Sequence, residues 1–141
     1  MECFAKYDPG ELCIQEFLPA EQDYRVLVIG YKALPKIVSR KPYAGEVVTN
    51  SAANAEFSPR HIDDFPGLRE LAERAAKALR REFAGVDIRY RNETPLILEV
   101  NRQPTFEGFE LVTSIDVASA FLHYIETRFN SHVADSHADK R

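Results

Sequence analysis

The feature that most constrains this chain is a stretch from Phe83 to Pro104, in which two apolar runs flank a turn centred on Glu93. Side chains in both runs alternate with a period of two residues, which is typical of a β-hairpin. Opposite residues of a hairpin share a face, so the apolar residues define the register. The pairs predicted on the apolar face are Val86 with Val100, Ile88 with Leu98, and Tyr90 with Leu96.

The other face of this hairpin carries Asp87 directly opposite Glu99, with Asn101 just beyond them on the same side. Two facing carboxylates repel one another and raise each other's pKa unless a positive charge lies between them. A Mg²⁺ or Mn²⁺ ion would supply that charge, because two carboxylates and an amide oxygen form a hard, all-oxygen ligand set. Alternatively, Arg89 and Arg91 neutralise the carboxylates in a solvated ion-pair network. Spacing alone leaves both interpretations open.

The rest of the pattern predicts an α+β fold with a mostly antiparallel sheet flanked by helices. Strands are expected over residues 12–18 and 24–31, because these segments are short, apolar and rich in Ile, Val and Phe. A third is expected over residues 34–41, where Lys36, Val38 and Arg40 alternate with Ile37 and Ser39. Residues 30–32 supply a turn between the last two. From 41 to 64 the sequence is dominated by Pro, Gly, Asn, Ser and Ala, which predicts a loop.

Two helices are expected. The first opens at Pro66 and is stopped by Gly85, a residue suited to a left-handed C-cap. Ser114 is predicted to cap a second helix. The residues expected to face inward are Leu68, Leu71, Ala75, Leu79 and Phe83 in the first helix, and Val117, Phe121, Leu122, Ile125 and Phe129 in the second. Residues 131–141 are expected to form a hydrophilic tail.

Composition excludes several classes of protein. A chain of 141 residues with 45% hydrophobic content is expected to form one domain. Its net charge of −4 disfavours nucleic-acid and anionic membrane surfaces, so a small molecule or a neutral protein face is the expected partner. Apolar runs fall short of the roughly 18 residues that a membrane span needs. Two cysteines, Cys3 and Cys13, without a signal peptide ahead of them, favour a reducing, cytoplasmic location.

Five segments, taken in order, resemble a known family. They are QEFLPAEQDYRVLVIG from Gln15, an arginine at Arg40 followed by a G-E-x-x-x-N loop at residues 45–50, GVDI from Gly85, LEVNRQPTFEGFE from Leu98, and SIDVA from Ser114. The ordered set is similar to the C-terminal half of the ATP-grasp fold, in its RimK-like branch of glutamate and other amino-acid ligases. The similarity extends over about residues 14–128.

This resemblance implies site residues. Asp87, Glu99 and Asn101 match positions that hold one or two Mg²⁺ ions bridging the ATP phosphates, in agreement with the hairpin pattern. Arg25 and Arg40 match arginines that hold substrate carboxylate or acyl-phosphate oxygens, to which Arg offers a planar fork.

The resemblance also implies a nucleotide site. The matching positions are Glu16, Phe17 and Leu18 for the hinge that binds adenine through its backbone, Asp23 for the ribose or hinge rim, and Val48, Thr49 and Asn50 for the loop along the phosphates. None of the four histidines is expected to be catalytic.

The activity implied is ligation, in which ATP phosphorylates a carboxylate and an amine attacks the acyl phosphate. Residues 1–130 are expected to be a partial ATP-grasp domain, without the first subdomain and the domain that precedes it in the family. The chain would then be a half-enzyme that needs a second chain. A non-catalytic nucleotide- or metal-binding remnant and an interaction module are the alternatives. Thr105 and Phe106 replace small residues of the family, which affects the acceptor pocket.

Overall fold

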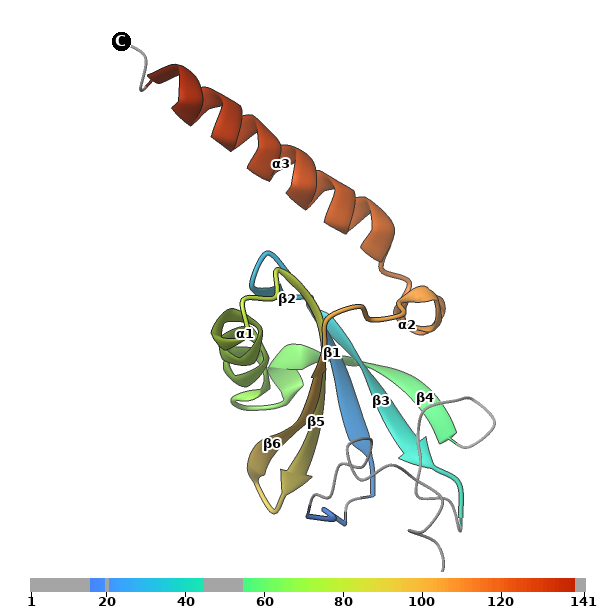
Figure 1. Cartoon of the computed structure of the whole chain (residues 1–141). Helices are drawn as coiled ribbons and strands as arrows, with labels where there is room; N and C mark the ends of the chain where they lie inside the picture. The colour runs from blue at the N-terminus through green and yellow to red at the C-terminus, as the bar shows by residue number, and fades with distance from the viewer. Residues whose placement is uncertain (1–15, 20, 45–54, 139–141) are drawn as a thin grey trace, which may run out of the picture.

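The structure is a computed structural model that describes residues 16–19, 21–44 and 55–138, with side chains described as far as Asn130. An antiparallel sheet of strand order β4-β3-β1-β5-β6 lies at its centre, with β2 paired to β1, and three α-helices flank it (Figure 1). The elements are β1 Asp23–Ile29, β2 Lys32–Ala33, β3 Lys36–Pro42, β4 Ala55–His61, a short 3₁₀ helix Ile62–Asp64, α1 Leu68–Ala78, β5 Phe83–Arg91, β6 Thr94–Asn101, α2 Glu107–Thr113 and α3 Val117–Ala138. The predicted α+β class with a mostly antiparallel sheet is confirmed.

Each face of the sheet has its own hydrophobic core, because side chains of a strand point alternately to opposite sides. On one face, Tyr24, Val26 and Val28 of β1 pack with α1. On the other, Leu27 and Ile29 pack with α2 and the start of α3. Odd-numbered residues of β1 therefore point toward α2, and even-numbered residues point toward α1.

The predicted strands over 24–31 and 34–41 correspond to β1 and β3, with shifted bounds. Gly30 and Tyr31, with φ of 58° and 63°, form the turn between β1 and β2. The strand predicted over 12–18 is not found in its described part, because residues 16–18 belong to no strand; residues 12–15 lie outside the described residues.

The loop predicted over 41–64 is wrong over part of its length. Residues 55–61 form β4, which pairs with β3 at seven positions from Lys36↔His61 to Pro42↔Ala55. The polar composition and Pro59 conceal this strand, and both are compatible with its place at the edge of the sheet, where one side of the backbone is left unpaired.

The first helix is shorter than predicted. It ends at Ala78, and Arg80, with φ of 53°, takes the left-handed conformation that was expected of Gly85. Gly85 instead lies inside β5, where an added Cβ would approach the Cβ of Pro104 to 2.9 Å. The lack of a side chain at Gly85 allows β5 to pack closely against the chain after β6. The prediction that Gly85 caps the first helix is therefore wrong.

The helical segment at the C-terminal end also differs from the prediction. Residues 107–113 form an unexpected helix, α2, and Ser114, with φ of 57°, ends that helix instead of capping the next one. Asp116 caps α3, since its Oδ1 accepts a hydrogen bond of 2.7 Å from the backbone N–H of Ser119. The backbone of α3 continues to Ala138, so the segment predicted as a tail is helical up to that residue.

Among the side chains of α3 described, those of the first turns pack against the sheet. Val117 is buried, and the ring of Phe121 stacks on Phe83 with 4.5 Å between centroids. The inward orientation predicted for Leu122, Ile125 and Phe129 is wrong, because all three are exposed. The helix projects from the body of the molecule (Figure 1). Within the described part of the chain, no helix is both long and apolar enough to cross a membrane.

Candidate functional site

The hairpin of β5 and β6 brings Asp87 and Glu99 together as cross-strand neighbours, as the register argument predicts. Val86 pairs with Val100 as predicted, but a bulge between Asp87 and Ile88 shifts the rest of the register. Ile88 therefore pairs with Ile97, and Tyr90 with Pro95, rather than with the leucines expected. The bulge lies beside the carboxylate pair and leaves that pair intact.

The two carboxylates differ in environment. The Asp87 side chain is only 5% exposed, whereas that of Glu99 is 61% exposed. Burial raises the pKa of Asp87, but the hydrogen bond from Arg25 and the charges of Arg40 and Arg25 outweigh burial and hold that pKa below its usual value. Partial burial, followed by the charge of Asp87, raises the pKa of Glu99. The buried member of the pair is thus the more strongly ionised one.

An arginine from the adjacent strand lies between these carboxylates. Arg25 of β1 is the cross-strand partner of Asp87 and grips it with two hydrogen bonds, Nε to Oδ1 at 2.8 Å and Nη2 to Oδ2 at 2.7 Å. The same Nη2 lies 3.8 Å from Oε1 of Glu99. This bidentate contact raises the pKa of Arg25 further above its ordinary value.

A second arginine, Arg40 of β3, completes the network from the other side. Its Nη2 lies 3.0 Å from Oδ2 of Asp87, and its Nε donates to Oδ1 of Asp23. Arg40 and Asp23 are both buried. The ion-pair alternative predicted that Arg89 and Arg91 neutralise the carboxylates. That assignment is wrong for Asp87, because the arginines that neutralise it are Arg25 of β1 and Arg40 of β3.

Arg89 has a different role from the one predicted. Its Nη1 donates to the backbone carbonyl of Leu18 at 2.7 Å, and its Nη2 lies 3.6 Å from Oδ2 of Asp23. Its buried Nε has no hydrogen-bond partner in the described part of the molecule. Arg91 pairs with Glu16 at 2.6 Å. Both arginines therefore tie the segment around Glu16 and Leu18 to the edge of the polar site.

The structure thus brings together most of the residues that the sequence singled out. Arg25, Arg40, Asp23, Asp87 and Glu99 form one connected cluster on the α2 side of the sheet. Glu16 and Leu18 are joined to it through arginines of β5, and Phe17 is exposed beside them. Val48, Thr49 and Asn50 lie outside the described residues, and their predicted contact with phosphates stays a prediction.

Asn101 lies on β6 opposite Gly85, two residues beyond Glu99 and therefore on the same side of the strand. Its Oδ1 accepts a hydrogen bond of 2.9 Å from the backbone N–H of Gln103. The described residues hold no group of three or more His, Cys, Asp or Glu side chains arranged for a metal ion. The candidate ligand set therefore depends on an amide in addition to the two carboxylates.

Sequence reasoning named Arg89 but missed its contact with Leu18, because nothing in the order of residues shows that its side chain reaches a carbonyl 71 positions away. A small hollow of about 130 Å³ lies beside the cluster, and sequence reasoning did not predict it either. Its lining includes Arg25, Arg40, Thr105 and Phe109, so Thr105 faces the hollow that both arginines border.

The sequence of the chain is similar to those of known proteins. The family model for the RimK-like ATP-grasp domain matches residues 9–125. Ribosomal protein bS6–L-glutamate ligase of Escherichia coli O81 (strain ED1a) is 36% identical over 119 residues, which are 83% of this chain and 39% of that ligase. The ligase of the same name from Shigella boydii serotype 18 (strain CDC 3083-94 / BS512) is 35% identical over 119 residues. The chain thus spans about two-fifths of the length of these relatives.

Solved structures show the same fold. The ATP-grasp ligase PsnB, complexed with a phosphomimetic variant of its minimal precursor, Mg and ADP, has a TM-score of 0.59 at 22% identity and covers 79% of this chain and 34% of that one. A D-alanine–D-alanine ligase from Bacillus anthracis has a TM-score of 0.56 at 20% identity, over 84% of this chain and 42% of that one.

The family match covers most of the chain, and the two glutamate ligases are more than 30% identical to it over 83% of its length. The predicted resemblance is confirmed, and the chain belongs to the RimK-like ATP-grasp family.

Proposed function

We propose that this chain carries the metal- and phosphate-facing part of an ATP- and Mg²⁺-dependent carboxylate–amine ligase, and that a second polypeptide segment completes the nucleotide site. The observation that carries the proposal is the cluster of Arg25, Arg40, Asp87 and Glu99 on one sheet face. The similarity to glutamate ligases also supports it, and the matched region of this chain spans 39% of the length of such a ligase.

The donor atoms of the proposed metal site fit Mg²⁺ in kind. Asp87, Glu99 and Asn101 offer oxygen ligands from adjacent strands, and Glu99 is open to solvent. Oδ1 of Asp87 accepts one hydrogen bond from Arg25, and Oδ2 is shared by Arg25 and Arg40, so part of its acceptor capacity stays open. A bound Mg²⁺ would neutralise phosphate charge there.

The two arginines suit different tasks. The side chain of Arg40 is 6% exposed and is held by Asp23 and Asp87, so it fixes the position of the Asp87 carboxylate. Both arginines border the hollow that Thr105 lines, but Arg25 is 18% exposed, so it is the more accessible of the two to a ligand oxygen. Its raised pKa keeps it cationic at any physiological pH.

In the reaction we propose, an oxygen of the substrate carboxylate attacks the γ-phosphorus of ATP, the bond to the bridging oxygen breaks, and ADP leaves. The amine nitrogen then attacks the carbonyl carbon of the acyl phosphate, which releases phosphate and a proton and forms an amide bond. Arg25 would stabilise negative charge on the phosphoryl and carbonyl oxygens. The segment at Glu16, Phe17 and Leu18 would bind adenine, held in place by Arg89 and Arg91.

A second candidate, a non-catalytic nucleotide- or metal-binding module, is favoured by one observation. Asp87 is already neutralised by two arginines, so the fold does not need a metal at this carboxylate. Ligand binding without turnover distinguishes this candidate from the ligase.

The test is a set of thermal melts of the wild type, Glu99→Gln and a control, Glu126→Gln, on an exposed turn of α3. Each is measured in EDTA, in Mg²⁺, and in Mg²⁺ with a non-hydrolysable ATP analogue. A ligand at 100 times its Kd stabilises the folded state by about 2.7 kcal/mol. We expect a Mg²⁺-dependent rise in melting temperature in the wild type and control, and its loss in Glu99→Gln.

No ligand response in the wild type, or an equal response in Glu99→Gln, contradicts the metal assignment for this chain. Release of ADP and amide formation are then measured after adding a polypeptide that supplies the other part of the ATP-grasp domain. Turnover in the mixture supports the ligase, whereas nucleotide binding without turnover supports the non-catalytic module.

A further inference from the structure

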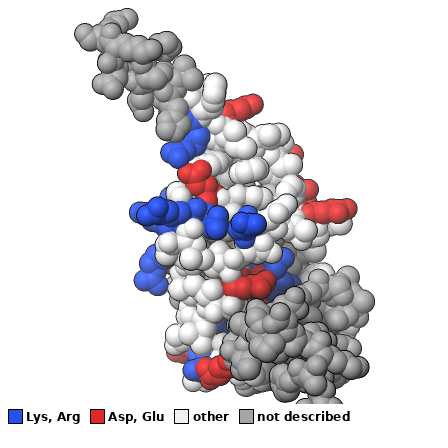
Figure 2. Space-filling view, viewed as in Figure 1, with Lys and Arg blue, Asp and Glu red and all other residues white. Residues whose placement is uncertain are grey.

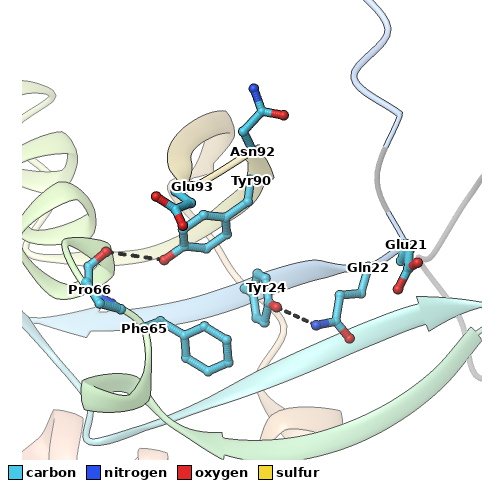
Figure 3. A pocket seen from close by; sticks show the side chains of 8 residues that line it. All are labelled: Glu21, Gln22, Tyr24, Phe65, Pro66, Tyr90, Asn92 and Glu93. Carbon is cyan, nitrogen blue, oxygen red and sulfur yellow. Dashed lines mark hydrogen bonds between the residues drawn. The ribbon is translucent and has the colours of Figure 1, made fainter.

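A second cavity lies on the face of the sheet opposite the arginine–carboxylate cluster. Its volume is about 760 Å³, and it is lined by Glu21, Gln22, Tyr24, Phe65, Pro66, Tyr90, Asn92 and Glu93 (Figure 3). Tyr24 points to the α1 side, since its neighbours in β1, Asp23 and Arg25, point to the other. This aromatic pocket is therefore separate from the proposed ligase site.

Three aromatic rings form its apolar part. Tyr24 and Phe65 have centroids 4.6 Å apart with a 54° tilt, and Tyr24 and Tyr90 lie 5.7 Å apart at 85°. Tyr24 is buried, whereas Phe65 and Tyr90 are partly exposed, so these two rings offer most of the aromatic surface that a ligand can reach. The electron-rich face of a tyrosine ring attracts cations.

Hydrogen bonds hold the two tyrosine rings in place. The hydroxyl of Tyr24 accepts a hydrogen bond from Nε2 of Gln22, and the hydroxyl of Tyr90 donates one to the carbonyl oxygen of Pro66 at 3.4 Å. Both dashed contacts are visible in Figure 3. Burial, and then the proximity of Tyr24, raises the pKa of Tyr90, so its ring stays neutral and its hydroxyl remains a donor. A ligand would meet ring surfaces that are already oriented.

The charged groups of the pocket are both negative. Glu93 lies beside Tyr90 at the hairpin turn, and Glu21 lies on the far side next to Gln22 (Figure 3). No lysine or arginine is among the described residues that line the pocket. Within the described part of the chain, neither carboxylate forms an ion pair, although acidic and basic side chains are interspersed elsewhere on the surface (Figure 2).

We propose that this aromatic pocket binds an organic cation, an ammonium or guanidinium group on an aliphatic arm. The rings would cover the arm and attract the head group, and Glu21 and Glu93 would neutralise its charge. An anion is disfavoured by both carboxylates, and a wholly apolar ligand would leave them without a partner. The source of the cation is either a free alkylamine or a lysine or arginine side chain of a bound peptide.

The test is an NMR titration of the full 141-residue chain. The free-amine probe is butylammonium with n-butanol as its neutral control. The peptide probe is a capped Gly-Lys-Gly peptide, with norleucine in place of lysine as its control. We expect saturable shifts of the Tyr24 and Tyr90 ring signals with the cations, at a Kd of about 1–10 mM, and binding of the neutral controls at least about threefold weaker.

Variants identify the groups responsible. Glu21→Gln and Glu93→Gln should each weaken cation binding about two- to fivefold, whereas Glu126→Gln, which removes an exposed carboxylate from α3, should leave the Kd unchanged. Tyr90→Leu should weaken binding by a similar factor through loss of its ring. All three carboxamide variants alter exposed side chains, so their folding is expected to be retained.

The two probes also separate the sources of the cation. Tighter binding of the lysine peptide than of butylammonium supports a peptide side chain, and equal or tighter binding of butylammonium supports a free amine. Equal binding of cation and neutral control, or equal weakening by Glu126→Gln, overturns the proposal. Because no nucleotide or metal enters these titrations, the result is independent of the ligase assignment.

Discussion

The Asp87→Asn substitution provides a direct test of how the arginine–carboxylate cluster is held together. Asparagine keeps the size of the side chain and one acceptor oxygen, but it removes the charge that faces Arg25 and Arg40. Removing one partner of a buried ion pair costs about 3–5 kcal/mol. The expected cost here is lower, about 2–4 kcal/mol, because Arg40 keeps Asp23 and Arg25 is partly exposed near Glu99.

Glu99→Gln is the matched control, since it makes the same chemical change on the directly opposite residue. Glu99 is 61% exposed and lies 3.8 Å from Arg25, so this pair is worth at most about 1 kcal/mol, and losing the repulsion from Asp87 offsets that loss. Urea unfolding at pH 7 measures both variants. If Asp87→Asn lowers the free energy of unfolding by less than about 0.5 kcal/mol, or if both variants lower it equally, Asp87 is not the carboxylate that holds the cluster together.

The destabilisation by Asp87→Asn should also depend on pH. The pKa of Asp87 is lowered in the folded protein, so its charge stabilises the fold fully above the unfolded carboxyl pKa of about 3.9. That stabilisation is lost as the pH falls through the lower, folded pKa. The stability difference between wild type and Asp87→Asn should therefore shrink below about pH 4, and a difference that stays constant with pH contradicts the assignment.

The remaining predictions concern packing. Gly30→Ala should destabilise the fold by about 1–3 kcal/mol in urea unfolding, because φ is 58° and the new Cβ would lie 2.5 Å from the Tyr124 ring. Its control is Gly108→Ala in α2, where an added Cβ meets nothing within 4 Å, so stability should be unchanged or slightly higher. Phe121→Ala should lower the free energy of unfolding by about 2–4 kcal/mol, whereas Phe129→Ala, at a side chain 67% exposed, should change it by less than about 0.5 kcal/mol. Calorimetry measures both variants, and similar losses of stability would contradict the finding that Phe121 packs on the sheet while Phe129 does not.

Local pattern was sufficient to predict the central hairpin and the facing carboxylates. Alternation of apolar residues predicts the pairing of Val86 with Val100, and that pairing alone places Asp87 opposite Glu99. It could not predict the bulge after Asp87, because a bulge changes the register without changing the composition of either strand. The ordered motifs also identified the family, since they depend only on residue type and order.

Long-range pairing decided which cations neutralise Asp87. Arg89 and Arg91 are close to it in sequence, but the neutralising contacts come from Arg25 and Arg40, which reach it through the β3-β1-β5 strand order. Strand order is set by how both faces of the sheet are covered, a property of the whole domain.

Tertiary packing also decided which apolar residues are buried. The periodicity of α3 predicts that Leu122 and Phe129 are buried as Val117 is, yet both are exposed, and the described side chains that contact the sheet belong to the first turns of the helix. At the other extreme, the apolar alternation of β4 is limited to Ala55, Phe57 and Pro59, and its pairing with β3 stabilises a strand that the sequence pattern assigned to a loop. Sequence periodicity reports which side of an element is apolar, whereas the extent of the neighbouring surface determines how much of that side is covered.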